Sequence, residues 1–176
     1  FNVVGTGWRL KEIAKIIKKG KILDIGCGFG MLAEFLEEDI DYTGVDINES
    51  RLDYARKKYK DHPKRKFMKG KRDKINFKDN VFDYVVIGEI IEHVENPSEF
   101  LEECKRVLKK RGKVIGSTPN ATDFIRILKA IIRKEHGSAQ HLCLFSEYEM
   151  RNLLKHVGFK DIKIKFTLFR LTPKLK

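Results

Sequence analysis

The chain contains few of the residues that hold secreted or membrane-embedded proteins together. Its three cysteines are odd in number and lie far apart, which argues against a disulfide framework and a structural zinc site. No stretch approaches the roughly 18 uncharged residues that a membrane span requires, and no segments typical of a signal peptide open the chain. We therefore expect a cytoplasmic protein without a membrane span.

Glutamine is almost missing too, since Gln140 is the single one, whereas positive charge is in excess. Lysine and arginine number 37 against 25 acidic residues, which gives a formal net charge of +12 and a pI near 9.6. An anionic partner such as RNA, a phosphorylated metabolite or an acidic lipid surface would explain this excess. Adaptation to high temperature, in which charged residues replace thermolabile ones, would explain it equally well.

Patterns typical of strands and helices alternate along the chain. Short β-rich apolar runs predict strands at 21–25, 42–45, 65–68, 82–87, 114–117 and 161–171. Helical spacing and capping signals predict helices at 8–19, 31–38, 49–59, 96–111, 123–134 and 146–157. The amphipathic helix at 123–134 either packs on the core or forms a lid. The alternation predicts one α/β domain over residues 1–176, with a Rossmann-like, doubly wound, mostly parallel sheet and helices on both faces.

A glycine-rich turn between the first strand and the next helix is the first functional signal. Gly26, Gly28 and Gly30 stand where the backbone must turn tightly and approach a ligand. Asp46 closes the second strand, a position from which a carboxylate accepts both hydroxyl protons of a ribose. Because Met31 replaces the third glycine of a dinucleotide fingerprint, the pattern argues against NAD or FAD. No Gly-Lys-Ser/Thr follows the turn, which excludes a P-loop.

Four segments in this order resemble the class I S-adenosylmethionine-dependent methyltransferases, over roughly residues 21–159. They are Asp24 with the glycine turn, Asp46, the fourth-strand segment Asn80-Val-Phe-Asp-Tyr-Val-Val, and the stretch from Leu108 to Ser117. The resemblance implies S-adenosyl-L-methionine as cofactor, with Asp24 helping to bind its methionine amino group and Asp46 holding its ribose. Taken alone, Asp24 would equally be a turn cap. The further cofactor-binding residues that the resemblance implies are Gly26, Cys27, Gly28, Ile47, Arg72 and Gly88.

The segment before the fourth strand departs from the family pattern Gly-Asp-Ala-Glu-x-Leu-Pro-Phe. It reads Gly70-Lys-Arg-Asp-Lys-Ile-Asn-Phe77, so Lys71 stands where the family has the aspartate that hydrogen-bonds the adenine amine. Either Asp73 takes over this contact, or backbone groups near Arg72 and stacking hold the adenine. The family also ends in a sixth and an antiparallel seventh strand, of which one is evident here.

A candidate metal site follows the fourth strand, where open α/β sheets bind ligands. On a helical turn Glu89, Glu92 and His93 would share a face, and two carboxylates with an imidazole suit Mg or Mn. Alternatively, the acids stabilise the positive end of a helix and the histidine is a surface residue. The pattern resembles ubiquinone-biosynthesis O-methyltransferases and small-RNA 3′-end 2′-O-methyltransferases. The RNA group has a further histidine after a Thr-Pro-Asn segment, which makes His141 a fourth ligand, with His136 as the weaker match.

The sequence thus predicts a methyltransferase that modifies a hydroxyl or a nitrogen of a small-molecule acceptor. In-line methyl transfer requires an aligned acceptor and removal of its proton. A metal would lower the pKa of an acceptor hydroxyl; without one, His93 or His141 would act as general base, because imidazole exchanges protons near neutrality. Two alternatives stay open: a metal-dependent RNA 2′-O-methyltransferase-like enzyme, and a methyltransferase-like domain that binds without catalysis.

Overall fold

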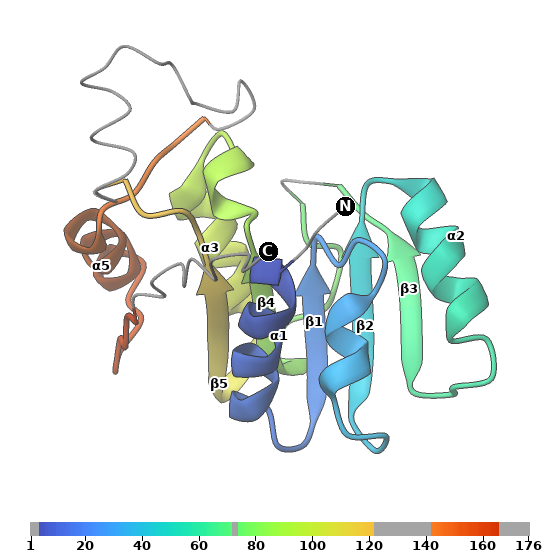
Figure 1. The fold of residues 1–176 in the computed structure, drawn as a ribbon. Coiled ribbons are helices and arrows are strands. Elements are labelled where there is room, and N and C mark those ends of the chain that lie inside the picture. The colour runs from blue at the N-terminus through green and yellow to red at the C-terminus, as the bar shows by residue number, and fades with distance from the viewer. Residues whose placement is uncertain (1–3, 72–73, 122–141, 166–176) are drawn as a thin grey trace, which may run out of the picture.

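The computed structural model describes residues 4–71, 74–121 and 142–165, which form alternating strands and helices (Figure 1). The α-helices are α1 (Val4–Ile16), α2 (Glu49–Lys58), α3 (Pro97–Val107) and α5 (Glu147–His156), and two short 3-10 helices are η1 (Met31–Phe35) and η2 (Ile91–His93). The strands are β1 (Lys21–Ile25), β2 (Asp41–Asp46), β3 (Arg65–Lys69), β4 (Phe82–Gly88) and β5 (Leu108–Ser117).

These strands form one parallel sheet in the order β3-β2-β1-β4-β5 (Figure 1). The chain builds outward from β1 to β3, then crosses back to place β4 on the other side of β1. A reversal of strand order opens a crevice at the carboxyl ends of the two strands that flank it. The predicted Rossmann-like α/β fold is confirmed, and its switch point lies between β1 and β4.

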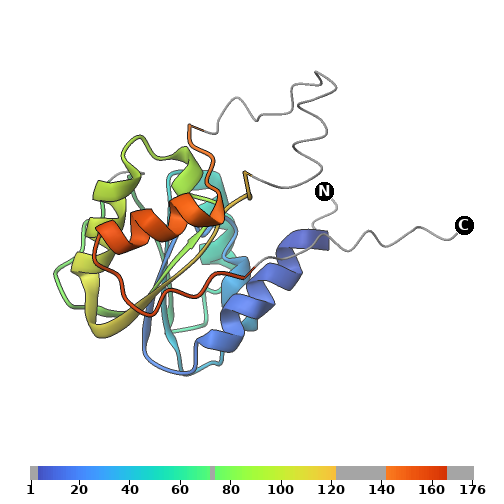
Figure 2. The same cartoon turned by 90° about the vertical axis from the view of Figure 1, so that its left-hand side faces the viewer.

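Two hydrophobic cores cover the two faces of the sheet. Neighbouring residues of β1 belong to different cores. Ile22 packs in the core that contains residues of α1 and α2, and Leu23 packs in the core that contains residues of α3 and α5. This follows from the alternation of side chains along a strand. Figure 2 shows α1 and α3 on opposite sides of the sheet. The predicted coverage of both faces is therefore confirmed.

The helix predicted at 31–38 is shorter and of another kind. The segment forms only the 3-10 helix η1, and Leu36 is already extended. The buried Arg65 side chain donates hydrogen bonds to the main-chain oxygens of Leu36 and Ile40. These bonds hold the extended segment that follows η1, so the chain leaves the helix before Glu38.

The boundary between α3 and β5 also differs from the prediction. The helix ends at Val107 rather than near Gly112, and Leu108 is extended and paired with Phe82 in β4. Because Tyr84 pairs with Lys113, residues 109–112 form an insertion opposite Asp83. Strand pairing with β4 therefore overrides the helical pattern that continues past Val107.

The remaining predicted elements have mixed outcomes. The helix α5 has the predicted capping box, in which Ser146 and Glu149 exchange hydrogen bonds with each other's main-chain N–H. The first helix covers Val4–Ile16 instead of 8–19. Residues 161–165 are not in a strand, and the rest of the strand predicted at 161–171 and the helix predicted at 123–134 lie outside the described residues. None of the described helices has the length and apolarity needed to cross a membrane.

Candidate functional site

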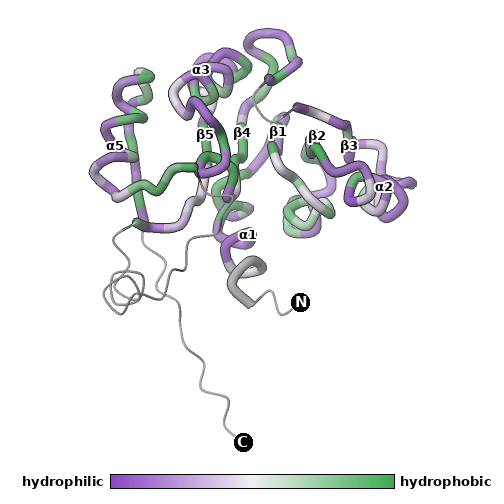
Figure 3. Tube along the Cα trace, turned by 90° about the horizontal axis from the view of Figure 1, so that it is seen from above, coloured by the Kyte–Doolittle hydropathy of each residue, from purple (hydrophilic) through white to green (hydrophobic). Residues whose placement is uncertain are grey.

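The glycine turn lies above β1 at the carboxyl edge of the sheet, the edge that faces the viewer in Figure 3. Gly26, Gly28 and Gly30 have φ values of +74°, +54° and +72°, which residues with a side chain rarely adopt. A Cβ on Gly26 would lie 2.2 Å from Cδ1 of Ile90, whereas a Cβ on Gly28 would meet no atom of the described residues within 4 Å. The first glycine is thus required by packing, and Gly28 borders open space from which a ligand can approach the backbone.

Asp46 closes β2 and holds the turn with both carboxylate oxygens. Its Oδ2 accepts a hydrogen bond of 2.9 Å from the N–H of Gly28, and its Oδ1 accepts one of 2.8 Å from the N–H of Asn48. Each carboxylate oxygen keeps a further lone-pair direction, so hydroxyl groups of a ligand can still donate to it. Ile47, next along the chain, is 51% exposed and offers an apolar surface at the rim.

Asp24 is the deepest acid of the site. It is 6% exposed on β1, and its Oδ2 accepts a hydrogen bond of 2.6 Å from the hydroxyl of Tyr42. Burial raises the pKa of Asp24 to about 7, an effect that the Tyr42 hydrogen bond opposes and the negative charge of Asp46 reinforces. A cationic group beside this carboxyl would favour its ionised form. The site therefore suits a ligand with an ammonium group near Asp24 and hydroxyl groups near Asp46.

Cys27 lies within the glycine turn, where its side chain serves packing rather than chemistry. Its side chain is buried against Gly44, where an added Cβ would lie 2.8 Å from the sulfur. Burial raises the pKa of the Cys27 thiol, and the negative charges of Asp24 and Asp46 add to this effect. The thiol therefore stays protonated and is a poor nucleophile.

The other side of the crevice begins where β4 ends. Gly88 pairs with Ser117 of β5, and a Cβ on Gly88 would meet only the Ser117 hydroxyl oxygen, at 3.8 Å. Glu89 then enters the left-handed region with a φ of +57°, while its N–H donates to the Ser117 carbonyl at 2.8 Å. Its carboxylate forms an ion pair of 2.9 Å with Arg9 of α1. This pair ties the first helix to the carboxyl edge of the sheet.

The predicted common face of Glu89, Glu92 and His93 is wrong. Glu89 precedes the short helix η2 in a left-handed conformation, so the three residues do not share one helical turn. Glu92 is instead 1% exposed, with Oε2 accepting a 3.0 Å hydrogen bond from the Thr118 hydroxyl and Oε1 without a hydrogen-bond partner among the described residues. Among residues 4–71, 74–121 and 142–165, no three His, Cys, Asp or Glu side chains are grouped to hold a metal ion.

Four residues of the predicted site lie outside the described part of the chain, and one residue of the observed site was not predicted. Arg72, Asp73, His136 and His141 lie outside the described residues. Tyr42 was not predicted from the sequence, although it contacts Asp24 directly. Its signal was available: Tyr42 pairs with Ile22 on β1, and residues two apart on a strand share a face.

Strand order, the glycine turn after β1 and the carboxylate after β2 together define a class I S-adenosylmethionine-dependent methyltransferase. The chain belongs to the methyltransferase domain family, whose model matches residues 23–116, more than half of the chain.

Two relatives of known sequence show how far the similarity extends along the chain. The chain is 31% identical over 166 residues to an uncharacterized protein of Methanocaldococcus jannaschii. This match covers 94% of this chain and 77% of the relative. It is 35% identical over 132 residues to a ubiquinone biosynthesis O-methyltransferase of Coxiella burnetii, which covers 73% of this chain and 56% of that enzyme. The chain thus spans little more than half the length of this ubiquinone-biosynthesis relative.

Solved structures show the same fold. A methyltransferase of Thermotoga maritima, named as a possible histamine N-methyltransferase, matches with a TM-score of 0.70 and 26% identity, over 86% of this chain and 70% of its own. A protein of Pyrococcus horikoshii matches with a TM-score of 0.69 and 25% identity, over 88% of this chain and 82% of its own.

Proposed function

We propose that this enzyme transfers the methyl group of S-adenosylmethionine to a hydroxyl or a nitrogen of a small-molecule acceptor. The observation that carries the proposal is the pair of buried carboxyls, Asp24 and Asp46, on adjacent strands beneath one glycine turn at the switch point. The acceptor class is supported by two relatives, one named for ubiquinone biosynthesis by O-methylation and one named for histamine N-methylation.

The residues of the turn divide the work of holding the cofactor. S-adenosylmethionine supplies an electrophilic methyl group on a sulfonium centre. Asp46 accepts hydrogen bonds from the ribose hydroxyls, and the exposed Ile47 side chain gives the adenine an apolar surface. Asp24 pairs with the amino group of the methionine part, and Gly28 lets the backbone approach the ligand because no side chain intervenes. Gly88 leaves equivalent room at the end of β4.

The acceptor loses a proton as it is methylated, and we assign that proton to His93. His93 ends η2 at the carboxyl edge of the sheet. Its main-chain N–H donates to the Ile90 carbonyl at 2.9 Å, which fixes the backbone there. A partly buried imidazole at this position is a suitable general base. His141 is the second candidate on sequence grounds. Mg or Mn would offer another route to an ionised acceptor hydroxyl, which the assay has to separate from base catalysis.

The proposal is tested in two stages. Calorimetric titration with S-adenosylhomocysteine measures cofactor binding, and labelled S-adenosylmethionine is then offered with catechols, other phenols, imidazole amines and RNA, each with EDTA or with Mn. Methylation of a phenol or an amine in EDTA, lost in His93→Ala with S-adenosylhomocysteine affinity unchanged, supports it. Absence of binding overturns it, methylation of RNA alone replaces the acceptor class, and turnover only with Mn replaces base catalysis by metal activation.

A further inference from the structure

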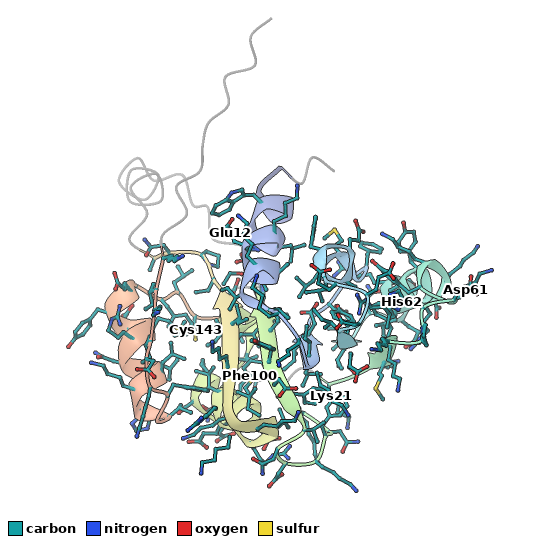
Figure 4. The ribbon with its side chains drawn as sticks, turned by 90° about the horizontal axis from the view of Figure 1, so that it is seen from below. Glu12, Lys21, Asp61, His62, Phe100 and Cys143 are labelled. Carbon is teal, nitrogen blue, oxygen red and sulfur yellow. The ribbon has the colours of Figure 1, made fainter. Side chains whose placement is uncertain are left out.

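The end of the sheet opposite the cofactor site carries a basic hollow of about 400 Å³. Four of its lining residues are the exposed cations Lys19, Lys110, Arg111 and Lys113, which we call the amino-edge surface. They come from the connection between α1 and β1 and from β5 with its insertion. Figure 4 views the molecule from this end, where Lys21 marks the beginning of β1.

The positive charge of this surface is not neutralised within the part of the chain that the structure describes. None of the four cations forms an ion pair there. The acid in the hollow, Asp83, is already bound to the Lys109 ammonium group at 2.9 Å and to the Lys21 N–H at 2.8 Å. Glu37, Glu38 and Asp39 precede β2, and Asp41 begins it beside Lys21 of β1, on the side of β1 away from β5. The hollow therefore presents four cations that form no ion pair with any acid of the described residues.

The backbone at Arg111 adds an observation independent of charge. Arg111 has a φ of +69°, a conformation that glycine and asparagine adopt with much less strain than arginine. A turn selected for stability alone would place one of those residues here. Strained positions of this kind are concentrated at sites of function, where the side chain is needed. Arg111 lines the hollow and is exposed.

The exposure of the hollow favours a polymer of phosphates over a single small anion. None of its lining residues is buried, so a single small anion would stay in contact with water, and each exposed cation would contribute little to its binding. Along a nucleic acid, many such contacts add up through counterion release. No large exposed apolar side chain occurs at 18–21, 83–84 or 109–113, as insertion into a lipid surface would require. Arginine also matches phosphate geometry with its planar guanidinium.

We propose that the amino-edge surface binds RNA through its backbone phosphates. This site is separate from the cofactor site, because β1 has five residues and a strand of that length spans about 16 Å. The proposal concerns RNA binding alone and does not rest on the proposed methyl acceptor.

The test measures binding of a fluorescein-labelled single-stranded RNA by fluorescence anisotropy over a series of salt concentrations. The variant Lys110→Glu/Lys113→Glu should bind about tenfold or more weakly and lose about one unit of salt slope per phosphate contact. The matched control, Lys57→Glu/Lys66→Glu, changes net charge equally at two exposed lysines of α2 and β3. It should bind RNA nearly as the unaltered protein does. Equal weakening of both variants overturns the proposal, since net charge alone would then explain binding.

A second variant uses the strained backbone. Arg111→Gly should raise the Tm, because it relieves the left-handed conformation, and should nevertheless weaken RNA binding. A higher Tm with unchanged RNA binding overturns the role of Arg111. Absence of RNA binding to the unaltered protein overturns the whole proposal and leaves the charge to thermal adaptation.

Competitors identify the ligand chemistry. Pyrophosphate that displaces RNA at equal phosphate concentration would assign the hollow to free polyphosphates. Polyglutamate or phosphatidylserine vesicles that bind as tightly as RNA would overturn the choice of RNA. S-adenosylhomocysteine titration of each variant should be unchanged, so failure here is distinguishable from failure of the proposed methyl transfer.

Discussion

The hydroxyl of Tyr42 donates a 2.6 Å hydrogen bond to Oδ2 of Asp24, joining β2 to β1 beneath the glycine turn. Both side chains are almost fully buried. Burial raises the pKa of Asp24 to about 7, while the Tyr42 hydrogen bond limits that rise and the charge of Asp46 increases it. The charge of Asp24 therefore changes within the range of pH at which the protein can be studied.

The first prediction is a dependence of stability on pH. Asp24 has an ordinary pKa of 3.8 and a folded-state pKa of about 7, so between these values the folded protein holds a proton that the unfolded chain has released. The contribution of Asp24 to the free energy of unfolding should therefore fall as pH rises through this window, by at most about 1.4 kcal/mol per pH unit. Denaturant titrations of the native protein and Asp24→Asn measure it. An identical pH slope in the two proteins contradicts the raised pKa.

The second prediction concerns ligand affinity. If the amino group of the cofactor pairs with ionised Asp24, binding must release the proton that Asp24 holds below pH 7. The affinity for S-adenosylhomocysteine should rise about tenfold per pH unit up to about pH 7 and then level off. Calorimetry in buffers of different ionisation enthalpy detects the released proton directly. Asp24→Asn should bind more weakly and without this pH dependence; a variant that keeps the dependence would assign it to another group.

The third prediction separates the two tasks of Asp46. Asp46→Ala should weaken S-adenosylhomocysteine binding by about 1.5 to 3 kcal/mol, because charge-assisted ribose contacts are lost. It should also lower the Tm, since the N–H groups of Gly28 and Asn48 lose their acceptor. Asp46→Asn keeps one acceptor oxygen, so its Tm should stay close to that of the native protein while its affinity for S-adenosylhomocysteine falls. Unchanged affinity in Asp46→Ala removes the ribose assignment.

The predictable parts of the site depend on local backbone requirements. The glycine turn and Asp46 were found because a tight strand-to-helix turn needs left-handed glycines and because parallel strands end at a common edge. The parallel sheet with helices on both faces followed from alternating strands and helices, which admit few arrangements. These signals lie within one element or between neighbours in the sequence.

The parts that sequence reasoning missed depend on distant contacts. The left-handed backbone of Glu89 accompanies its hydrogen bond to Ser117 and its ion pair with Arg9, residues 28 and 80 positions away. The early end of η1 accompanies hydrogen bonds from Arg65, and the early end of α3 accompanies pairing with β4. Helical spacing cannot register such partners, and the common helical face predicted for Glu89, Glu92 and His93 was wrong for that reason.

The fourth prediction compares two glycines of the same turn. Gly26→Ala would place a Cβ 2.2 Å from Cδ1 of Ile90, so the end of that side chain has to move, and with the strain of a φ of +74° the change should destabilise the fold by about 2 to 4 kcal/mol. At Gly28 the same change meets no atom within 4 Å and carries only the strain of its φ of +54°, about 1 to 2 kcal/mol. Gly28→Ala should therefore fold but bind S-adenosylhomocysteine poorly. Thermal melts with and without ligand test both, and normal affinity in Gly28→Ala would show that no ligand approaches there.

The fifth prediction concerns Glu92, which is 1% exposed and bonded through Oε2 to Thr118. Burial raises its pKa above the ordinary 4.5, and the charge of Glu89 adds to the shift. Because the folded state keeps the proton, the contribution of Glu92 to stability should decline as pH rises above about 4.5.

Glu92→Gln keeps the shape without the charge, so it should remove this decline and become relatively more stable at higher pH. Glu92→Ala leaves a cavity and an unpaired Thr118 hydroxyl, and should cost about 2 to 4 kcal/mol at pH 5 and less at pH 8. Denaturant titrations at pH 5 and pH 8 distinguish the variants; a Gln variant as unstable as the Ala variant at both would show that a carboxylate, not a neutral acid, is needed at this position.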